Sequence, residues 1–261
     1  MGKRAVWRAV AAVGTVLAIV PWAAAQAGEP REVRWQERPE APRHGDFVGE
    51  PGIAIEAMTE GFMAAHPDLR WRREGLHDYA NGRHGQAMTH FLQAARYADK
   101  ASQAMVAEMH WQGIGVPQDR ALGYAWMDLA AERRYPNFLI LRESYWDQLD
   151  ESTRAEAIER GQAVYAEYGD EVAKPRLEKV LRREKRKLTG SRTGFVGNIT
   201  IIPNTGPLAG TGMSIPGERF YAREYWEPER YWALQDTIWK SPPRGEVHVG
   251  DLVPGTEAAK D

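Results

Sequence analysis

Apolar residues recur three and four positions apart from Ile53 to about Leu188, which is the spacing of one face of an α-helix. Prolines in this region fall where such helices would begin or end. The pattern therefore predicts short helices near 53–65, 68–80, 84–97, 101–112, 118–133, 137–149, 152–168 and 173–188. The residues expected to cap helix N-termini with a side-chain oxygen are Asp68, Asp99 and Ser152.

The flanks of this helical region lack the pattern. Residues 28–50 are rich in Pro, Glu and Arg and are expected to form a flexible leader. Residues 189–261 hold seven Pro and ten Gly, which predicts a largely non-helical C-terminal region with a disordered end. Within it, residues 195–202 alternate loosely between apolar and polar side chains and are expected to form a single strand. The predicted fold class is all-α with a C-terminal extension.

The first residues have the order of a secretory signal peptide. Lys3, Arg4 and Arg8 precede an apolar run over residues 9–20, and small residues follow. The run is shorter than the ~20 residues that cross a bilayer. We expect residues 1–27 to be removed, leaving a periplasmic or secreted protein without a membrane span; the alternative is an uncleaved N-terminal anchor.

Composition narrows the function classes. The chain has no Cys, which excludes disulfides, thiolate metal sites and a Cys nucleophile. The formal net charge of −2 gives no general reason to expect nucleic acid as a partner.

Two segments match at an offset of 36 residues, 86–95 and 122–131. Small residues coincide at Ala87 and Gly123, and both segments end in Ala-Ala. Small side chains let two helices approach closely, while bulky ones three and four positions away fill the groove between them. The match indicates a repeated helix pair.

A glycine-rich turn separates the two segments. A predicted helix ends in Gly113-Ile114-Gly115-Val116-Pro117-Gln118-Asp119, and the next helix carries Trp126 and Ala130-Ala131. Gly113 and Gly115 can supply a left-handed turn, and Asp119 can cap the next helix. With the 36-residue offset, this motif resembles the Sel1-like repeat, a relative of the tetratricopeptide repeat.

The resemblance covers roughly residues 75–140 and rests on one well-formed unit, 104–131. The copy before it has a shorter turn, 81–85, and Arg133-Arg134-Tyr135-Pro136 replaces the usual start of a further repeat. The resemblance implies a short α/α solenoid over residues 53–188, whose last helices stack as atypical capping units, and a role as an adaptor or scaffold that binds proteins.

Candidate catalytic groups are few. His77, His84 and His90 lack the i, i+4 spacing of a helical metal site, although His77 precedes Asp78. No nucleophile elbow, phosphate loop or Ser-x-x-Lys motif occurs. We therefore predict no catalytic residue, cofactor or metal, and an interaction protein rather than an enzyme; an envelope hydrolase is the less favoured alternative.

Residues 174–192 hold nine basic and two acidic residues, with leucines at helical spacing. One interpretation is an amphipathic helix that contacts lipid head groups, a cell-wall polymer or an acidic partner through Arg182, Arg183 and Arg186. The other is a helix packed by its leucines, with its cations in water.

Seven aromatic residues fall between positions 220 and 239, interleaved with arginines. Trp, Tyr and Arg dominate interface hot spots, and flat rings also stack on sugars. We expect Tyr225, Trp226, Tyr231 and Trp232 to bind a protein or, as the alternative, a cell-wall polysaccharide. The opposing interpretation is that this segment folds back and buries its rings in a groove of the helical region.

Overall fold

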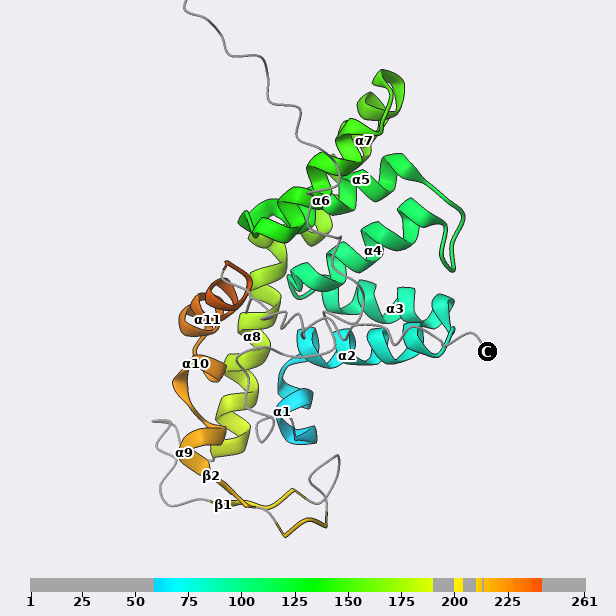
Figure 1. Ribbon diagram of the computed structural model, residues 1–261. Coiled ribbons are helices and arrows are strands. Elements are labelled where there is room, and N and C mark those ends of the chain that lie inside the picture. Colours follow the sequence, from blue (N-terminus) through cyan, green and yellow to red (C-terminus); the bar gives the residue numbers. More distant parts are fainter. Residues whose placement is uncertain (1–58, 190–199, 204–209, 213, 241–261) are drawn as a thin grey trace, which may run out of the picture. The chain divides into compact units, whose positions relative to one another are not determined.

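Helices dominate the part of the chain that the structure describes, and the fold is all-α (Figure 1). The computed structural model describes residues 59–189, 200–203, 210–212 and 214–240. In chain order the elements are α1 (Glu60–Ala65), α2 (Pro67–Ala80), α3 (His84–Ala95), α4 (Lys100–Gln112), α5 (Arg120–Ala130), the 3₁₀ turn η4 (Ala131–Arg133), α6 (Pro136–Asp147), α7 (Glu151–Tyr168), α8 (Asp170–Thr189), β1 (Thr200–Ile201), β2 (Ile215–Pro216), α9 (Gly217–Phe220), α10 (Arg223–Trp226) and α11 (Pro228–Lys240). Among the described residues, none of these helices has the length and apolar character that a membrane span requires.

The helices predicted from residue 68 to residue 188 all occur, with ends shifted by at most a few residues. The helix predicted over 53–65 begins at Glu60, capped by Thr59, and residues 53–58 lie outside the described residues. The capping prediction is confirmed for Asp99, whose side chain accepts from the Ser102 amide at 2.7 Å. It is wrong for Ser152, because Asp150 caps α7, and for Asp68, which lies inside α2. The predicted signal peptide and leader lie outside the described residues.

Part of the C-terminal region, for which the sequence predicts a largely non-helical chain, forms helices in the structure. Residues 214–240, here called the C-terminal segment, are mostly helical. Pro228 begins α11, where its fixed φ suits the first helical turn and its missing N–H costs nothing. Within the expected strand, residues 200 and 201 form β1, which pairs antiparallel with β2. Residues 195–199 lie outside the described residues.

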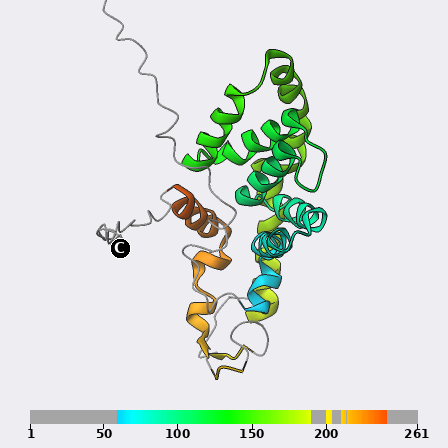
Figure 2. The same ribbon diagram turned by 45° about the vertical axis from the view of Figure 1, so that its right-hand side comes forward.

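The two matching sequence segments form α3 and α5. Each is the second helix of a pair, α2 with α3 and α4 with α5, and α3 also contacts α4 (Figures 1 and 2). Gly75 faces the Phe91 ring, where an added Cβ would lie 2.6 Å from Phe91 Cδ1. At Gly123 an added Cβ would lie 3.0 Å from the Trp111 amide nitrogen. The small residues therefore permit the close approach that the repeat pattern predicts, while a solenoid stays a prediction.

The turn between α4 and α5 has the predicted chemistry. Gly113 and Gly115 have φ of 75° and 73°, a left-handed conformation that strains side-chain-bearing residues. Asp119 caps α5 by accepting from the Leu122 amide at 2.9 Å. The glycines end one helix and the aspartate begins the next, as the motif indicates.

Three apolar clusters hold the described helices together. The largest joins α2 to α7 and includes Phe91, Met109, Met127 and Phe138. A second joins α1 and α2 to α9 and α10. The third joins α8 to α11 through Leu177, Leu181 and Tyr231. The C-terminal segment contacts all three clusters, because Trp239 packs against the largest one.

Candidate partner-binding groove

The predicted aromatic contact residues lie in the C-terminal segment, and three of them are buried. The exposed fraction is 0% for Tyr231, 1% for Trp226 and 8% for Tyr225, while Trp232 is half-buried. The expectation of an exposed aromatic surface is therefore wrong for the first three. The segment folds back onto the helical region, so a partner can reach these rings only if the segment moves.

The part of the C-terminal segment that contains α10 packs on α1 through aromatic rings. The Phe62 ring lies edge-on to the rings of Tyr225 and Trp226, with centroids 5.6 and 6.1 Å away. Trp226 satisfies its indole N–H by donating to the Phe220 carbonyl at 2.6 Å. Trp226 is therefore a core residue of this cluster, with both its ring and its polar atom in use.

His66 links α1 to α10. Its Nε2 lies 2.8 Å from the Tyr225 carbonyl oxygen and its Nδ1 lies 2.8 Å from the Phe62 carbonyl oxygen. Burial lowers the pKa of His66 to about 4, and the two carbonyl contacts act in the opposite direction. At neutral pH the ring is uncharged and donates through one nitrogen.

Tyr231 fixes the position of the start of α11. Its ring packs against Leu177 and Leu181, and its hydroxyl donates to Asp68 Oδ2 in α2. Asp68 is 3% exposed, and its Oδ1 has no hydrogen-bond partner within the described part of the chain. Burial raises the pKa of Asp68 to about 7. This contact joins residues 163 positions apart in the sequence.

Trp232 lies beside Tyr231 and faces charged groups. Its indole N–H donates to Glu178 Oε1 at 3.1 Å. The Arg133 guanidinium lies 4.7 Å from its ring centroid and the Lys174 ammonium 5.2 Å, both within the range of cation–π attraction. Trp232 is therefore already contacted at its polar atom and its ring.

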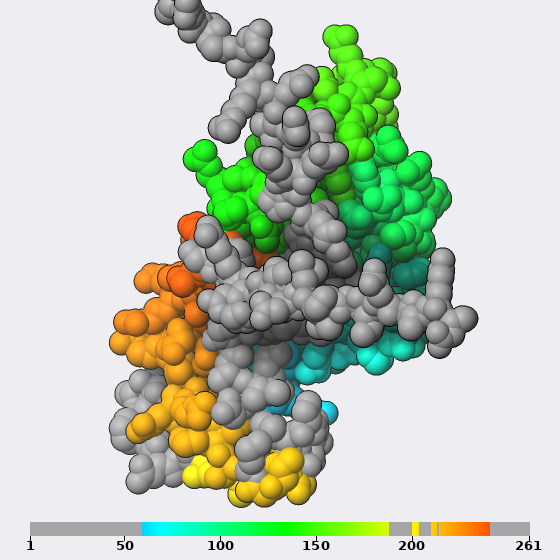
Figure 3. All heavy atoms as spheres, viewed as in Figure 1, coloured from blue at the N-terminus to red at the C-terminus, as the bar shows by residue number. Residues whose placement is uncertain are grey.

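The far end of α11 rests on α6 and the residue before it. Tyr135 donates a hydrogen bond to Asp236 Oδ1 at 2.8 Å. The Trp239 ring lies 6.3 Å from that of Tyr135 and 5.5 Å from that of Phe138. In Figure 3 the orange-red atoms of α11 adjoin green atoms of the α5–α6 region. We call the surface that receives this helix the α11 groove; its contact residues are Asp68, Tyr135, Phe138, Leu177, Glu178 and Leu181.

A buried ionic cluster lies behind Trp232. Lys100, with 1% of its side chain exposed, has its Nζ 2.6 Å from Glu132 and 3.2 Å from Asp170. Arg133 also holds Asp170, at 2.7 Å. Burial acts to raise the pKa of Asp170, but the hydrogen bond and charge of Arg133 hold it well below its usual range. The cluster joins α4, η4 and the start of α8, and so fixes one wall of the α11 groove.

The predicted basic contact residues differ from the aromatic ones in how far they are exposed to solvent. Arg182, Arg183 and Arg186 are exposed on α8, on the side away from Leu177 and Leu181. The sequence prediction grouped these arginines with the C-terminal aromatics as possible contact residues. The structure leaves the arginines exposed and buries three of the four aromatic side chains, while Arg182 and the half-buried Trp232 contact the same carboxylate, that of Glu178.

The histidines of the helix pairs belong to a polar network. His90 Nδ1 lies 2.9 Å from Asp78 Oδ2, and Arg83 contacts the same carboxylate at 2.6 Å. The Arg83 hydrogen bond lowers the pKa of Asp78. Among the described residues, no group of three or more His, Cys, Asp or Glu is placed to hold a metal ion. The contacts tie α3 and the α2–α3 turn to the C-terminal end of α2.

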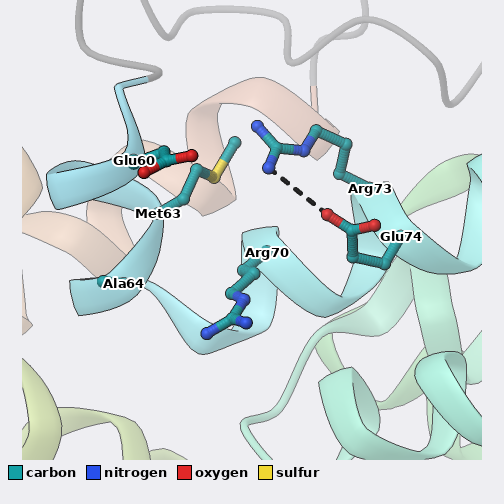
Figure 4. Close-up of a pocket in the computed structure, with 6 residues that line it drawn as sticks. All are labelled: Glu60, Met63, Ala64, Arg70, Arg73 and Glu74. Atoms are coloured by element: carbon teal, nitrogen blue, oxygen red, sulfur yellow. Dashed lines mark hydrogen bonds and ion pairs between the residues drawn. The ribbon is translucent and has the colours of Figure 1, made fainter. Parts of the chain in front are cut away.

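A hollow of about 310 Å³ lies at the bend between α1 and α2 (Figure 4). Arg73 and Glu74 form a 3.4 Å ion pair on one wall, and Glu60 and Met63 lie opposite. Its lining residues are Glu60, Met63, Ala64, Arg70, Arg73 and Glu74. Both signs of charge are present, so the lining selects no ligand class by charge alone.

The sequence analysis missed the residues that receive the C-terminal segment, chiefly His66, Asp68 and Tyr135. One signal was present: Tyr231, Gln235 and Trp239 are four apart, which is the spacing of one helix face. That spacing predicts an amphipathic helix at this position. The chain matches no family model, no curated protein and no solved structure.

Proposed function

We propose that this protein is an exported, non-catalytic interaction module of the bacterial envelope, periplasmic or secreted, whose α11 groove binds a helical segment of a partner protein. The observation that carries the proposal is the seating of α11, an amphipathic helix held by side chains of α2, α6 and α8. Laying the apolar face of a helix into a groove is a recurrent mode of protein recognition. The chain's own helix defines the ligand type that fits.

The helix pairs support the scaffold part of the proposal. The positive φ of Gly113 and Gly115, the Asp119 cap and the close approach at Gly123 suit a Sel1-like unit. Such repeats present extended surfaces to other proteins. We therefore assign the chain to the Sel1-like class as part of this proposal.

The groove favours a partner helix of defined chemistry. Tyr231 and Trp239, eight positions apart, occupy the two ends of the site, and Asp236 accepts from Tyr135 between them. A competing helix needs aromatic side chains about two turns apart on one face and an acceptor for the Tyr135 hydroxyl. Apolar or cationic helices without these groups should bind less well.

The polysaccharide alternative has less support. Trp226 is buried, and the ring of Trp232 is contacted by Arg133 and Lys174. Stacking on sugars requires an open ring face, which Trp226 lacks and for which Arg133 and Lys174 compete at Trp232.

The first test uses a labelled peptide of residues 228–240 and the full chain. We expect little binding to the wild-type protein, because α11 occupies the groove at an effective concentration near the millimolar range. Tyr231→Ala with Trp239→Ala weakens the resident helix and should increase peptide affinity at least about ten-fold. Fluorescence anisotropy measures both.

Trp71→Ala with Trp146→Ala is the matched control, because both rings are half-exposed and lie outside the groove. It should leave peptide affinity at the wild-type level. If the groove variant binds the peptide no better than this control, the helix-binding function is refuted.

Crosslinking in intact cells tests the physiological role. A photo-crosslinking residue in place of Glu178, which lines the groove on α8, should yield a discrete protein adduct. The same residue at Ile158, which is 58% exposed on α7, should not. Equal adducts at both positions would contradict a partner site at the groove.

A further inference from the structure

The outward face of α8 is uniformly basic over its C-terminal half. Every exposed side chain between residues 178 and 187 is a lysine or an arginine, namely Lys179, Arg182, Arg183, Arg186 and Lys187. Helical spacing places them on one face, about 12 Å long at 1.5 Å per residue. We call this surface the basic face of α8. The whole chain has a net charge of −2, so this positive charge is a local feature.

The acidic residues of the same stretch do not neutralise the basic face. Glu178 and Glu184 are only 24% and 17% exposed, and Glu178 accepts from the Trp232 indole. Glu178 and Glu184 pair with Arg182 and Lys187, whose side chains nevertheless stay 61% and 63% exposed. Exposed ion pairs of this kind are weak, so these cations can exchange their partners for an external anion.

The apolar side of α8 is already packed against α11. Leu177 and Leu181 have no exposed surface, because they pack against Tyr231 of α11. These leucines are therefore not available for insertion into a lipid layer in this conformation. Binding through the basic face is limited to polar head groups.

We infer that the basic face of α8 binds peripherally to a bilayer surface that contains anionic phospholipids. Three of its five cations are arginines, whose guanidinium forks bind phosphate oxygens in a bidentate manner. The cations project side by side from one convex helix, which suits a flat layer of laterally mobile head groups. The N-terminal pattern predicts export, which would bring the protein to an envelope membrane.

The test measures co-sedimentation of the full chain with vesicles of ~30% phosphatidylglycerol in phosphatidylcholine, and with phosphatidylcholine alone. The ratio of the two partition constants cancels any contribution of the apolar N-terminal run. Each basic residue near an anionic surface changes binding about five-fold. Arg182→Gln, Arg183→Gln and Arg186→Gln together should lower the ratio about a hundred-fold, and Arg186→Gln alone about five-fold.

The matched control is Arg73→Gln, Arg83→Gln and Arg120→Gln, three exposed arginines outside α8 with the same change in charge. It should leave the ratio within about two-fold of wild type, because surface charges act only over about a Debye length. Far-UV circular dichroism and Tm verify that all variants fold. The wild-type ratio should also fall steeply between about 50 and about 300 mM NaCl.

Three results would overturn the inference. The first is an equal ratio for the α8 variants and the control. The second is a wild-type ratio that does not respond to salt. The third is tighter binding to soluble polyphosphate than to anionic vesicles at matched phosphate concentration, which would identify a soluble polyanion as the ligand.

Discussion

The helix pairs α2–α5 and the C-terminal segment both bury large rings, but they do so by different means. In the pairs, glycines leave room for a neighbouring helix, as Gly75 does for Phe91 and Gly123 for the backbone at Trp111. In the C-terminal segment, each anchoring side chain also makes a polar contact: Tyr231 with Asp68, and Trp232 with Glu178.

The two regions also differ in the sequence distance that their contacts cross. Gly75 and Phe91 are 16 positions apart, within one helix pair. The anchors of α11 join residues 163, 101 and 54 positions apart. Contacts of the first kind close a short loop, whereas contacts of the second kind close loops of 54 to 163 residues, which cost more chain entropy and form more slowly. The C-terminal segment therefore completes the tertiary structure, and its contacts persist only while the helical region is folded.

The largest effect is expected from Trp226→Ala, which tests whether the C-terminal segment is part of the cooperative fold. Truncating a fully buried Trp should lower the free energy of unfolding by about 3–5 kcal/mol. Urea denaturation should show one transition, shifted as a whole. Trp71→Ala, at a half-exposed ring in α2, should cost clearly less. Two separate transitions in the wild-type protein would show instead that the segment unfolds independently.

A smaller, pH-dependent effect is expected at Asp68, the buried anchor of Tyr231. The pKa of this carboxyl is about 7 in the folded protein, against a model-peptide value of 3.8. The folded state therefore holds the proton more tightly, and this contribution to stability is fully present below pH 3.8 and lost as pH rises through 7.

Asp68→Asn removes this titration while keeping an acceptor for the Tyr231 hydroxyl. Between pH 5 and pH 8, the free energy of unfolding of the wild type should fall by about 2 kcal/mol relative to the variant. Denaturant titrations of both proteins at the two pH values measure the difference. His66 is present in both proteins, so its own titration cancels. Parallel stability curves for the two proteins would contradict the raised pKa.

The smallest effect is expected at the helix crossings, where two glycines should respond with opposite signs. Gly123→Ala introduces a Cβ 3.0 Å from the Trp111 amide nitrogen, so α4 and α5 must separate slightly, and a net loss of about 1 kcal/mol is expected. Gly161→Ala, in α7, meets only Ala125 Cβ at 3.9 Å. It should stabilise the protein by up to about 1 kcal/mol through helix propensity. Thermal unfolding distinguishes the two, and a gain at both positions would show that the crossing is loosely packed.

The prediction of the fold from sequence succeeded where the determining information is local. Apolar periodicity locates α2 to α8, and the Gly113–Asp119 motif predicts both the left-handed turn and the cap of α5. It failed at Pro228, which starts a helix although proline is scarce inside helices. A proline can either begin a helix or interrupt one, and contacts with neighbouring residues decide which of the two occurs.

Prediction of the candidate site was less complete for a physical reason. An aromatic-rich segment has the same sequence pattern whether its rings contact a partner or the chain itself. Asp68 illustrates the difficulty: its residue type suggests a helix cap, yet it is a buried acceptor for a tyrosine 163 positions away. No spacing within the sequence connects two such residues.

By itself, the sequence determined the all-α class, the positions of the helices in the helical region and the basic character of α8. Helical periodicity and charge are properties of neighbouring residues, so they can be read from the sequence. The tertiary structure alone decided which surfaces are free. It buried Tyr225, Trp226 and Tyr231 against α1, α2 and α8, and it left the arginines of α8 exposed. Burial depends on which distant segments meet, and that is settled only when the whole chain has folded.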